Sequence, residues 1–471
     1  MKRKTTKRFL PDVLIVCVVL VVALPVFLLR LGWGSLEPWD EAWYAEIGRN
    51  VTRGHIMVLE SHGRAYYDHP PLGFWLMGLS FTIFDESEFA ARLPMALAGL
   101  TSVVMMYFIG KALKNRWVGL MAAAILLSSR WFVYRARTGN LDALLVLMQL
   151  LVFYFSYRRR RLSDIYLAWL FLALALLTKS VISLTLLPLV LGATYSYFKR
   201  YRWQLAQLGL IGLLFFGPLL TWYGYNFKLF GVSLLQRNIW EVGLRKMSGG
   251  GLRLTKLKET IQMVQSLVHR WFKPFLVSIS LGLMFINISS IAWVLAYLFL
   301  VAFPYVLSSK VTIWHMVPIT APMALLIALV INQVTIIAAQ RLKTYHIAPI
   351  ALSVLGLIGT LVLSGYTFFE LLPELYRVTD EPSGQKILGS ALRTYPGLLY
   401  LDSYENLATS VMYYADRQII YLNTVTGKRD ISNVQRPYSL LTRNKAYLGP
   451  DCQVVTEHTD IYAIHCLAVE E

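Results

Sequence analysis

Two adjacent acids, Asp40 and Glu41, follow the first long apolar stretch of the chain, in the segment EPWDEAWYAEIGRN. Pro38 and acids in the turn after it are typical of the start of a helix. Asp40 could therefore be an ordinary helix-start acid that accepts hydrogen bonds from backbone N–H groups. A carboxylate in this place could also act as a general base that takes a proton from an acceptor hydroxyl.

The neighbouring segments favour the chemical interpretation of Asp40. GRAYYDHPPLGFWLMG contains Asp68 and His69 before a paired proline that fixes a turn, and its aromatic residues are suited to stacking on a ring. RARTGNLDALL presents Arg135 and Asp142 where a later apolar stretch begins. An ionisable residue at a membrane helix end that faces the protein interior is a functional candidate. Three aspartates on one side of the membrane are not explained by a purely structural scaffold.

The composition shows what kind of chain must position these residues. Of 471 residues, 56% are hydrophobic and 15% charged, and the mean hydropathy is +0.52, which indicates a polytopic membrane protein in contact with membrane lipids. The net charge of +18 comes from short basic clusters between apolar segments. Such clusters orient helices in a membrane, so we expect no nucleic-acid binding. The basic start has no small-residue cleavage site after it, and the first helix is expected to remain as an anchor.

The number of crossings follows from the length of the apolar stretches, because a helix needs roughly 20 apolar residues to cross a bilayer. Eleven candidate spans are predicted, at 11–31, 88–110, 117–134, 141–157, 164–178, 181–197, 204–225, 273–287, 291–307, 313–334 and 347–369. The basic clusters, including RRRR at 158–161, then lie inside as orientation signals, and the acid pair lies outside. The stretch 164–197 must break at Thr178 and Lys179, since without that break the topology downstream inverts.

One segment conflicts with this topology. The loop 226–273 is rich in Lys and Arg, yet the predicted topology places it outside. Either the topology is wrong there, or external basic residues bind an anion such as a lipid phosphate, for which the forked donors of Arg are well suited. Lys179 has two interpretations as well: it extends from a helix end to the interface, or it faces the site near Asp142.

After residue 369 the pattern changes to short β-prone runs separated by Gly, Pro, Asp and Asn. We predict a transmembrane domain over 1–369, with external loops 32–87 and 226–273, followed by a small soluble α/β domain over 370–471. The predicted strands are LLYLDSY, RQIIYLN, AYLGP, CQVVTEH and DIYAIHC, and SGQKILGSALRTY has helical spacing. Cys452 and Cys466 flank a predicted hairpin; they could pair if this domain is external and should be free thiols if it is cytoplasmic.

These segments, read in order, resemble a known family. WDEAWYAEIGRN, YYDHPPLGFWL, FDESEFAARLPMALAGL, ARTGNLDALL, ALLTKS and SSKVTIWHMVPITAP follow the blocks of the GT-C membrane glycosyltransferases. The subgroup is similar to the lipid A aminoarabinose transferases and the bacterial relatives of protein O-mannosyltransferases. The resemblance implies a GT-C fold of about 11 transmembrane helices with a small periplasmic α/β domain. It also implies that the catalytic carboxylate is Asp40, with Glu41 beside it, and that the second acidic position is Asp142.

The chain departs from the pattern of the aminoarabinose transferases at three positions. Trp43 and His69 stand where that subgroup has Arg and Lys, and His315 replaces a Tyr. The first two changes remove fixed positive charges of the type that binds a phosphate, so donor binding must use other residues. The candidates for donor or phosphate binding are Tyr44, His69, Lys179, Arg245, Lys246, Arg270, Lys310 and His315.

A divalent metal ion is a further candidate. Carboxylate and imidazole groups suit such an ion, and Asp68, His69 and His269 could gather at the site. The alternative is a polar lining without an ion, since the sequence has no tight ligand spacing.

The resemblance implies a bacterial inner-membrane enzyme whose active site faces the periplasm. It would move a sugar from a polyprenyl-phosphate carrier to a lipid acceptor, similar to lipid A or lipopolysaccharide, or to another cell-envelope glycan. The alternative class is a lipid or sugar transporter or flippase without transfer chemistry. A secondary transporter should show internal repeats and helices broken at matching positions in two halves, and the sequence shows no such repeat. The sugar, the acceptor and the oligomeric state are left open.

Overall fold

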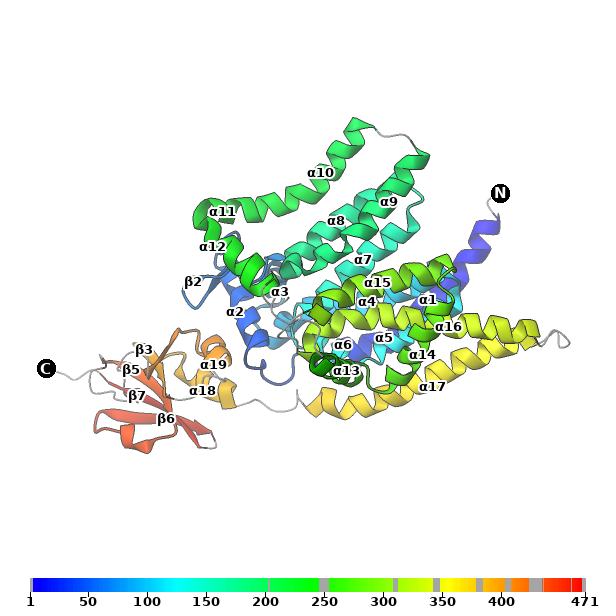
Figure 1. The fold of residues 1–471 in the computed structure, drawn as a ribbon. Helices are drawn as coiled ribbons and strands as arrows, with labels where there is room; N and C mark the ends of the chain where they lie inside the picture. The colour runs from blue at the N-terminus through cyan, green and yellow to red at the C-terminus, as the bar shows by residue number, and fades with distance from the viewer. Residues whose placement is uncertain are drawn as a thin grey trace.

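A helical bundle carries a smaller α/β unit at one end (Figure 1) in the computed structural model of the chain. The structure describes residues 3–201, 204–244, 254–307, 312–341, 348–377, 384–402, 408–422, 434, 436–458 and 460–467. The α/β unit lies beside α2 (Asp40–Thr52), and the N-terminus lies at the opposite end of the bundle.

The helices of the first half of the bundle cover most of the predicted apolar segments. Besides α2 they are α1 (Arg3–Leu28), α3 (Leu72–Phe84), α4 (Glu88–Leu113), α5 (Arg116–Leu127), α6 (Arg130–Arg137), α7 (Asp142–Arg158), α8 (Leu162–Lys179) and α9 (Leu187–Arg200). A short hairpin of β1 (Glu60–Ser61) and β2 (Arg64–Ala65) lies between α2 and α3. Ser87 and Asn115 accept hydrogen bonds from backbone N–H groups and so cap the starts of α4 and α5.

The second half of the bundle contains more interrupted helices. They are α10 (Leu205–Leu219), η2 (Leu220–Gly224), α11 (Tyr225–Phe230), α12 (Val232–Leu235), η3 (Gln236–Leu244), α13 (Leu254–Val268), η4 (His269–Trp271), α14 (Phe272–Met284), α15 (Ser289–Leu307), η5 (Ile313–Ile319), α16 (Thr320–Arg341) and α17 (Ala348–Arg377). The predicted external loop 226–273 is thus largely helical where the structure describes it.

Six helices of the described chain are long and apolar enough to cross a membrane, and a bent pair, α5 and α6, makes a seventh if it counts as one span. This confirms a polytopic helical membrane protein, while the number of eleven crossings stays a prediction. The span predicted over 117–134 is not one straight helix, because the chain bends there by 67°, and its crossing stays a prediction. α5 ends where the backbone N–H of Ser128 bonds back to Ala124, and the Ser128 hydroxyl accepts a hydrogen bond from Trp271.

The predicted break between two crossings at Thr178 and Lys179 is confirmed. α8 ends at Lys179, a 3-10 segment, η1 (Ser180–Leu186), follows, and α9 begins at Leu187. Polar residues interrupt the apolar run at this point, and the ammonium group of Lys179 forms an ion pair with Asp142, the first residue of α7.

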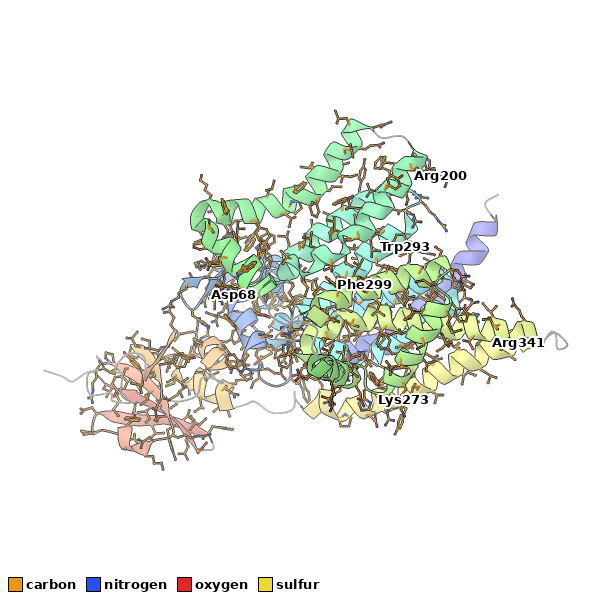
Figure 2. The ribbon with its side chains drawn as sticks, viewed as in Figure 1. Asp68, Arg200, Lys273, Trp293, Phe299 and Arg341 are labelled. Carbon is orange, nitrogen blue, oxygen red and sulfur yellow. A yellow bond between two sulfur atoms is a disulfide. The ribbon has the colours of Figure 1, made fainter. Side chains whose placement is uncertain are left out.

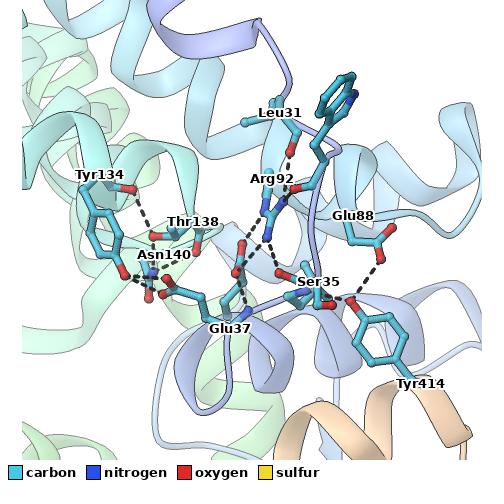
Figure 3. Close-up of polar contacts among 12 residues, drawn as sticks. Leu31, Ser35, Glu37, Glu88, Arg92, Tyr134, Thr138, Asn140 and Tyr414 are labelled. Carbon is cyan, nitrogen blue, oxygen red and sulfur yellow. Dashed lines mark hydrogen bonds and ion pairs between the residues drawn. The ribbon is translucent and has the colours of Figure 1, made fainter. Parts of the chain in front are cut away.

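A buried ion pair ties the segment between α1 and α3 to the bundle (Figure 3). Arg92 of α4 donates from Nε to Glu41 Oε1 at 2.6 Å, and both side chains are 1% exposed. Its other guanidinium nitrogens donate to the backbone carbonyls of Leu31, Trp33 and Ser35. All donors of this guanidinium therefore find acceptors, as a buried charge requires. The pair fixes the loop between α1 and α2 against α4.

The second oxygen of Glu41 organises the turn before α2. The backbone N–H of Glu37 donates to Glu41 Oε2 at 2.7 Å, and the Tyr134 hydroxyl donates to the Glu37 carboxylate. Burial raises the pKa of Glu37, and the Glu41 charge raises it further. On the neighbouring helix, Arg137 donates to the carbonyls of Val26 and Leu29 and so satisfies the end of α1.

The chain ends in a mixed sheet with the strand order β4-β3-β5-β7-β6. Its elements are α18 (Gly384–Leu392), β3 (Leu398–Leu401), α19 (Ala408–Ala415), β4 (Ile419–Tyr421), β5 (Tyr438–Thr442), η7 (Lys445–Tyr447), β6 (Cys452–His458) and β7 (Ile461–Cys466). β3 runs parallel to β4 and β5, and β7 runs antiparallel to β5 and β6. Apolar clusters cover both faces of the sheet.

Most of the predicted elements of this unit are present, with one error and two omissions. AYLGP was predicted as a strand, and this is wrong: Lys445–Tyr447 form a 3-10 turn capped by the Asn444 side chain. The central strand β5 and the helix α19 were not predicted. β6 and β7 form the predicted hairpin, with Cys452 opposite Cys466, and these two cysteines are joined by a disulfide.

We predict that Glu41→Gln destabilises the fold strongly, because it leaves the Arg92 charge buried without a counter-ion. Breaking a buried pair from one side typically costs about 3–5 kcal/mol. Thermal melting of the purified protein in detergent measures the effect. Glu60→Gln is the matched control, since the Glu60 side chain is 30% exposed and forms an ion pair with the partly exposed His55. Equal melting of Glu41→Gln and the wild type would contradict the role given to this pair.

Candidate functional site

A row of four side chains with alternating charge lies where α2, α6, α7 and α8 meet. It consists of Asp40, Arg135, Asp142 and Lys179. Arg135 donates from Nε to Asp142 Oδ2 at 2.7 Å, and its Nη2 lies 3.3 Å from Asp40 Oδ2. Lys179 donates from Nζ to Asp142 Oδ1 at 2.5 Å. The name charge relay is used below for these four residues, Asp40, Arg135, Asp142 and Lys179. It refers only to their order in space and not to a transfer of charge or protons. The structure thus brings Asp40 and Asp142 to opposite sides of one guanidinium.

Four helices position the charge relay. Asp40 and Asp142 are the first residues of α2 and α7, Arg135 lies in α6, and Lys179 is the last residue of α8. An acid at a helix start is favoured by the helix dipole, and a base at a helix end is favoured likewise. The bend between α5 and α6 directs α6 across the start of α7. The preference of acids for helix starts and of bases for helix ends therefore favours the same arrangement of charges as the packing of these helices.

Exposure distinguishes the two aspartates. The Asp142 side chain is 1% exposed and accepts from two cations, whereas the Asp40 side chain is 39% exposed and its ion pair among the described residues is the 3.3 Å contact to Arg135. Asp142 therefore neutralises and orients Arg135 and Lys179. Asp40 keeps oxygen surface that an incoming molecule can reach.

The backbone just before Asp40 is strained and is held by the C-terminal unit. Trp39 has φ of 73°, a left-handed conformation that a bulky residue rarely adopts. Its N–H donates to Thr409 Oγ1 at 2.6 Å, and the N–H of Leu36 donates to the Tyr414 hydroxyl at 2.7 Å. Tyr414 in turn donates to Glu88 at the start of α4 (Figure 3). Helix α19 therefore fixes the turn that carries Asp40.

Charged contacts strengthen the same interface. Arg53 at the end of α2 donates to both oxygens of Asp416 at 2.9 and 2.6 Å, and buried Arg49 lies 3.1 Å from Asp416. Arg49 also donates to the Tyr413 carbonyl and lies over the Tyr413 ring. Hydrogen bonds from Arg53, with the charge of Arg49, hold the pKa of Asp416 below its ordinary value.

We predict that acid loosens this interface through Asp416. Because the pKa of Asp416 is lowered in the folded state, its contribution is complete above the ordinary Asp pKa of about 4 and is lost as the pH falls through the lowered value. The protection factors of the α19 amides, in which exchange rates are corrected for the intrinsic pH dependence of amide exchange, should therefore fall with acid in the wild type. Asp416→Asn should show fast exchange already at neutral pH. Asp451→Asn is the control, since Asp451 pairs with Arg436 inside the sheet unit. Identical exchange in all three proteins would contradict this role.

Of the residues proposed to bind the donor, Tyr44 and His69 lie near Asp40. Their rings meet edge to face at 5.9 Å. Burial, together with the neighbouring Asp40 charge, raises the pKa of Tyr44, so its hydroxyl remains a neutral donor. Lys179 joins the charge relay, which favours the interpretation that it faces the site over extension to the interface.

The remaining donor-binding candidates are not gathered around Asp40 by any contact that the structure describes. Arg270 forms an ion pair with Glu370 and donates to Tyr366 on α17. His315 caps the 3-10 turn η5 through Thr312. Arg245, Lys246 and Lys310 lie outside the described residues.

The predicted metal ligands do not form a cluster. Within the described ranges, no group of three His, Cys, Asp or Glu residues could hold a metal ion. Asp68 lies at the end of the bundle next to the α/β unit (Figure 2), and both its oxygens accept from Arg237 at 2.6 and 2.8 Å. His269 lies in η4, beside Arg270. Asp68, His69 and His269 are thus not such a group, and the participation of a divalent ion stays a prediction.

No functional role was predicted from the sequence for Arg92, Glu37, Tyr414 or Thr409. For Arg92 a signal existed, because an Arg inside an apolar helix is rare and usually pairs with another group. Glu37 stands next to the acid pair and could have been assigned with it. Tyr414 and Thr409 lie more than 360 residues from Leu36 and Trp39, and no local pattern links them.

The polytopic helical fold, and the meeting of Asp40 with Arg135 and Asp142 where the segment after α1 reaches α7, resemble the GT-C membrane glycosyltransferases. The chain superposes on ArnT from Cupriavidus metallidurans over 97% of its own length and 99% of that chain, with a TM-score of 0.73 and 15% identity. An oligosaccharyltransferase from Archaeoglobus fulgidus matches 86% of this chain and 62% of its own, with a TM-score of 0.53 and 11% identity. These structures show the likeness of fold.

Sequence comparisons narrow the resemblance. The model of the dolichyl-phosphate-mannose-protein mannosyltransferase family matches residues 68–222. An undecaprenyl phosphate-alpha-4-amino-4-deoxy-L-arabinose arabinosyl transferase from Pseudomonas fluorescens is 29% identical over 209 residues, 41% of this chain and 36% of its own. The relative of the same name from Sodalis glossinidius is 33% identical over 144 residues, 30% of this chain and 25% of its own. The chain thus matches about a quarter to a third of these relatives, and its predicted resemblance to the aminoarabinose transferases is confirmed.

Proposed function

We propose that the chain is a glycosyltransferase that moves a sugar from a polyprenyl-phosphate carrier to a lipid acceptor, similar to lipid A, or to another cell-envelope acceptor. The observation that carries this proposal is the charge relay, in which a partly exposed Asp40 stands beside cations that Asp142 holds in place. The fold agrees, since ArnT from Cupriavidus metallidurans, which has a similar architecture, has been solved bound to undecaprenyl phosphate. The curated relatives are named arabinosyl transferases.

The chemistry needs the groups that the charge relay supplies. An acceptor oxygen attacks the anomeric carbon, the bond from that carbon to the phosphate oxygen breaks, and the polyprenyl phosphate leaves with the electron pair. The transition state resembles the oxocarbenium-like state of glycoside hydrolysis. Asp40 takes the proton of a hydroxyl acceptor. If the acceptor is a phosphate oxygen, it has little proton to lose and Asp40 orients it.

The cations stabilise the leaving phosphate. Arg135 and Lys179 form the positive side of the charge relay, and fixed positive groups aimed at developing charge lower a barrier without reorganising during the reaction. Asp142 orients them. Glu41 takes a positioning role, since both its oxygens are occupied by Arg92 and the backbone of Glu37. His69 and Tyr44 line the same region beside Asp40.

An apolar groove between α3, α4 and α7 offers space for the chain of a lipid-borne donor. It has a volume of about 370 Å³. Its lining is apolar apart from Ser80 and Thr101, as a prenyl chain requires, and contains no residue of the charge relay.

The orientation proposed for the site is towards the periplasm of a bacterial inner membrane. Two observations support it. The basic clusters concentrate away from the acid pair, as the positive-inside rule requires. The Cys452–Cys466 disulfide belongs to the unit that contacts the Asp40 turn, and disulfides persist in oxidising compartments. The domain division, 1–369 and 370–471, is part of the same proposal.

Donor turnover tests the proposal directly. Purified protein is incubated with a polyprenyl-phosphate sugar and an acceptor lipid, and the release of carrier phosphate is measured. Asp40→Asn should fold and insert normally yet lose about a hundred- to ten-thousand-fold in transfer rate, because a positioned general base contributes that much.

The control for this experiment is Asp85→Asn. Asp85 is exposed, has a left-handed backbone that Asn tolerates, and lies at the end of α3. Equal transfer by Asp40→Asn and the wild type would remove Asp40 from the mechanism. Movement of an intact donor across the membrane without release of phosphate would instead identify a transporter or flippase.

Loss of the Tyr414 hydroxyl should impair the same reaction from outside the site. We expect Tyr414→Phe to lower kcat by up to about a hundredfold with little change in donor KM, because the Asp40 turn is misplaced while the phosphate contacts remain. Tyr462→Phe is the matched control, since Tyr462 lies on β7. A wild-type kcat in Tyr414→Phe would contradict a positioning role for α19.

A further inference from the structure

A large cavity surrounded by basic residues lies far from the charge relay. It has a volume of about 1070 Å³ and is lined by the C-terminal ends of α4, α7 and α9 and by the connection between α7 and α8. Arg200 lies at the end of the bundle opposite Asp68 (Figure 2). The cavity therefore opens at the other membrane boundary from the site described above.

The cavity lining is strongly cationic. Its basic members are Lys111, Lys114, Arg158, Arg159, Arg160, Arg161 and Arg200, and no acid is among the lining residues. Basic residues at helix ends have an ordinary explanation, because they orient helices and complement helix dipoles. That explanation does not require them to converge on a shared cavity of this size.

Only part of this charge is neutralised inside the protein. Lys111 pairs with Asp12 at 2.6 Å, and Arg158 lies 3.4 Å from Asp164. Within the described part of the chain, no carboxylate forms an ion pair with the other five basic residues, which are Lys114, Arg159, Arg160, Arg161 and Arg200. Asp164 is buried and already accepts the backbone N–H groups of Arg160 and Arg161. The cavity thus holds an excess of positive charge.

The remaining lining suits the boundary between headgroups and acyl chains. Tyr154, Tyr157, Tyr197, Tyr201 and Phe108 line the cavity. Tyrosine is enriched at this depth of a membrane because its ring is apolar and its hydroxyl is polar. The volume is at the upper end of the range for ligand pockets, roughly 300–1,000 Å³, and is therefore large for a single inorganic ion.

We infer that this cavity binds the phosphate headgroup of an anionic phospholipid, with Arg160, Arg161 and Arg200 contacting phosphate oxygens and the tyrosines contacting the glycerol and the first acyl carbons. Basic pockets between membrane helices are suited to such headgroups. The forked donors of Arg match phosphate geometry. This lipid site is independent of the proposed transfer reaction, because it lies at the opposite boundary and shares no residue with the charge relay.

Native mass spectrometry of the full chain in a neutral detergent, titrated with phosphatidylglycerol, tests the inference. We expect retained phosphatidylglycerol and little phosphatidylcholine. The variant Arg160→Gln with Arg161→Gln should weaken phosphatidylglycerol binding by about tenfold or more, since each basic residue near the headgroup contributes to the attraction. Both side chains are exposed and outside helices, so the fold should persist.

Lys199→Gln with Arg341→Gln is the matched control. It removes the same charge at the same end of the bundle, and neither residue lines the cavity. Binding that falls equally in both double variants would reduce the effect to general surface charge and overturn the inference. Glycerol phosphate at the concentration of the lipid should not displace it. Full displacement would show that a soluble phosphate suffices and would overturn the assignment to a lipid.

Discussion

The buried pair between Arg92 and Glu41 is the constraint on which the site depends. It pins the loop after α1 to α4, and this loop leads directly into the helix that Asp40 begins. A charge buried in an apolar bundle is tolerated only when its partner and its remaining donors are satisfied. In this protein the Glu41 carboxylate and three backbone carbonyls accept the hydrogen bonds of the Arg92 guanidinium. The acid next to Asp40 is thus a structural anchor, which leaves Asp40 as the acid of the pair that faces an incoming molecule.

From that anchor the site is assembled by opposite charges on separate helices. Arg135 is shared between the two aspartates, and Lys179 neutralises the buried one, so two acids and two bases balance before any ligand arrives. The C-terminal unit then fixes the strained turn at Trp39 through α19. The C-terminal unit, which the sequence analysis treated as a separate domain, therefore helps to orient Asp40. The cationic cavity lies at the opposite end of the same bundle, and its basic residues are not part of the charge relay.

Comparing expectation with structure shows where sequence reasoning is strong. The helical segments and the break at Lys179 follow from composition and from polar residues inside apolar runs. For Lys179 the sequence left two positions open, and the structure favours the one near Asp142. The bend inside 117–134 was not predicted, because hydropathy averaged over a window does not register the polar pair Ser128 and Ser129. β5 was missed because its residues are all buried, so the strand lacks the alternation that identifies a half-exposed strand.

The sequence by itself determined that the chain is a polytopic helical membrane protein and which acids are worth testing, because hydropathy and charge are local properties. Only the tertiary structure decided which acid of the pair is buried and which is partly exposed, since that depends on Arg92, 51 residues away from Glu41. It also decided that Asp68 binds Arg237 and that α19 contacts the Asp40 turn. Contacts between distant residues depend on how whole helices pack, and no local pattern records them.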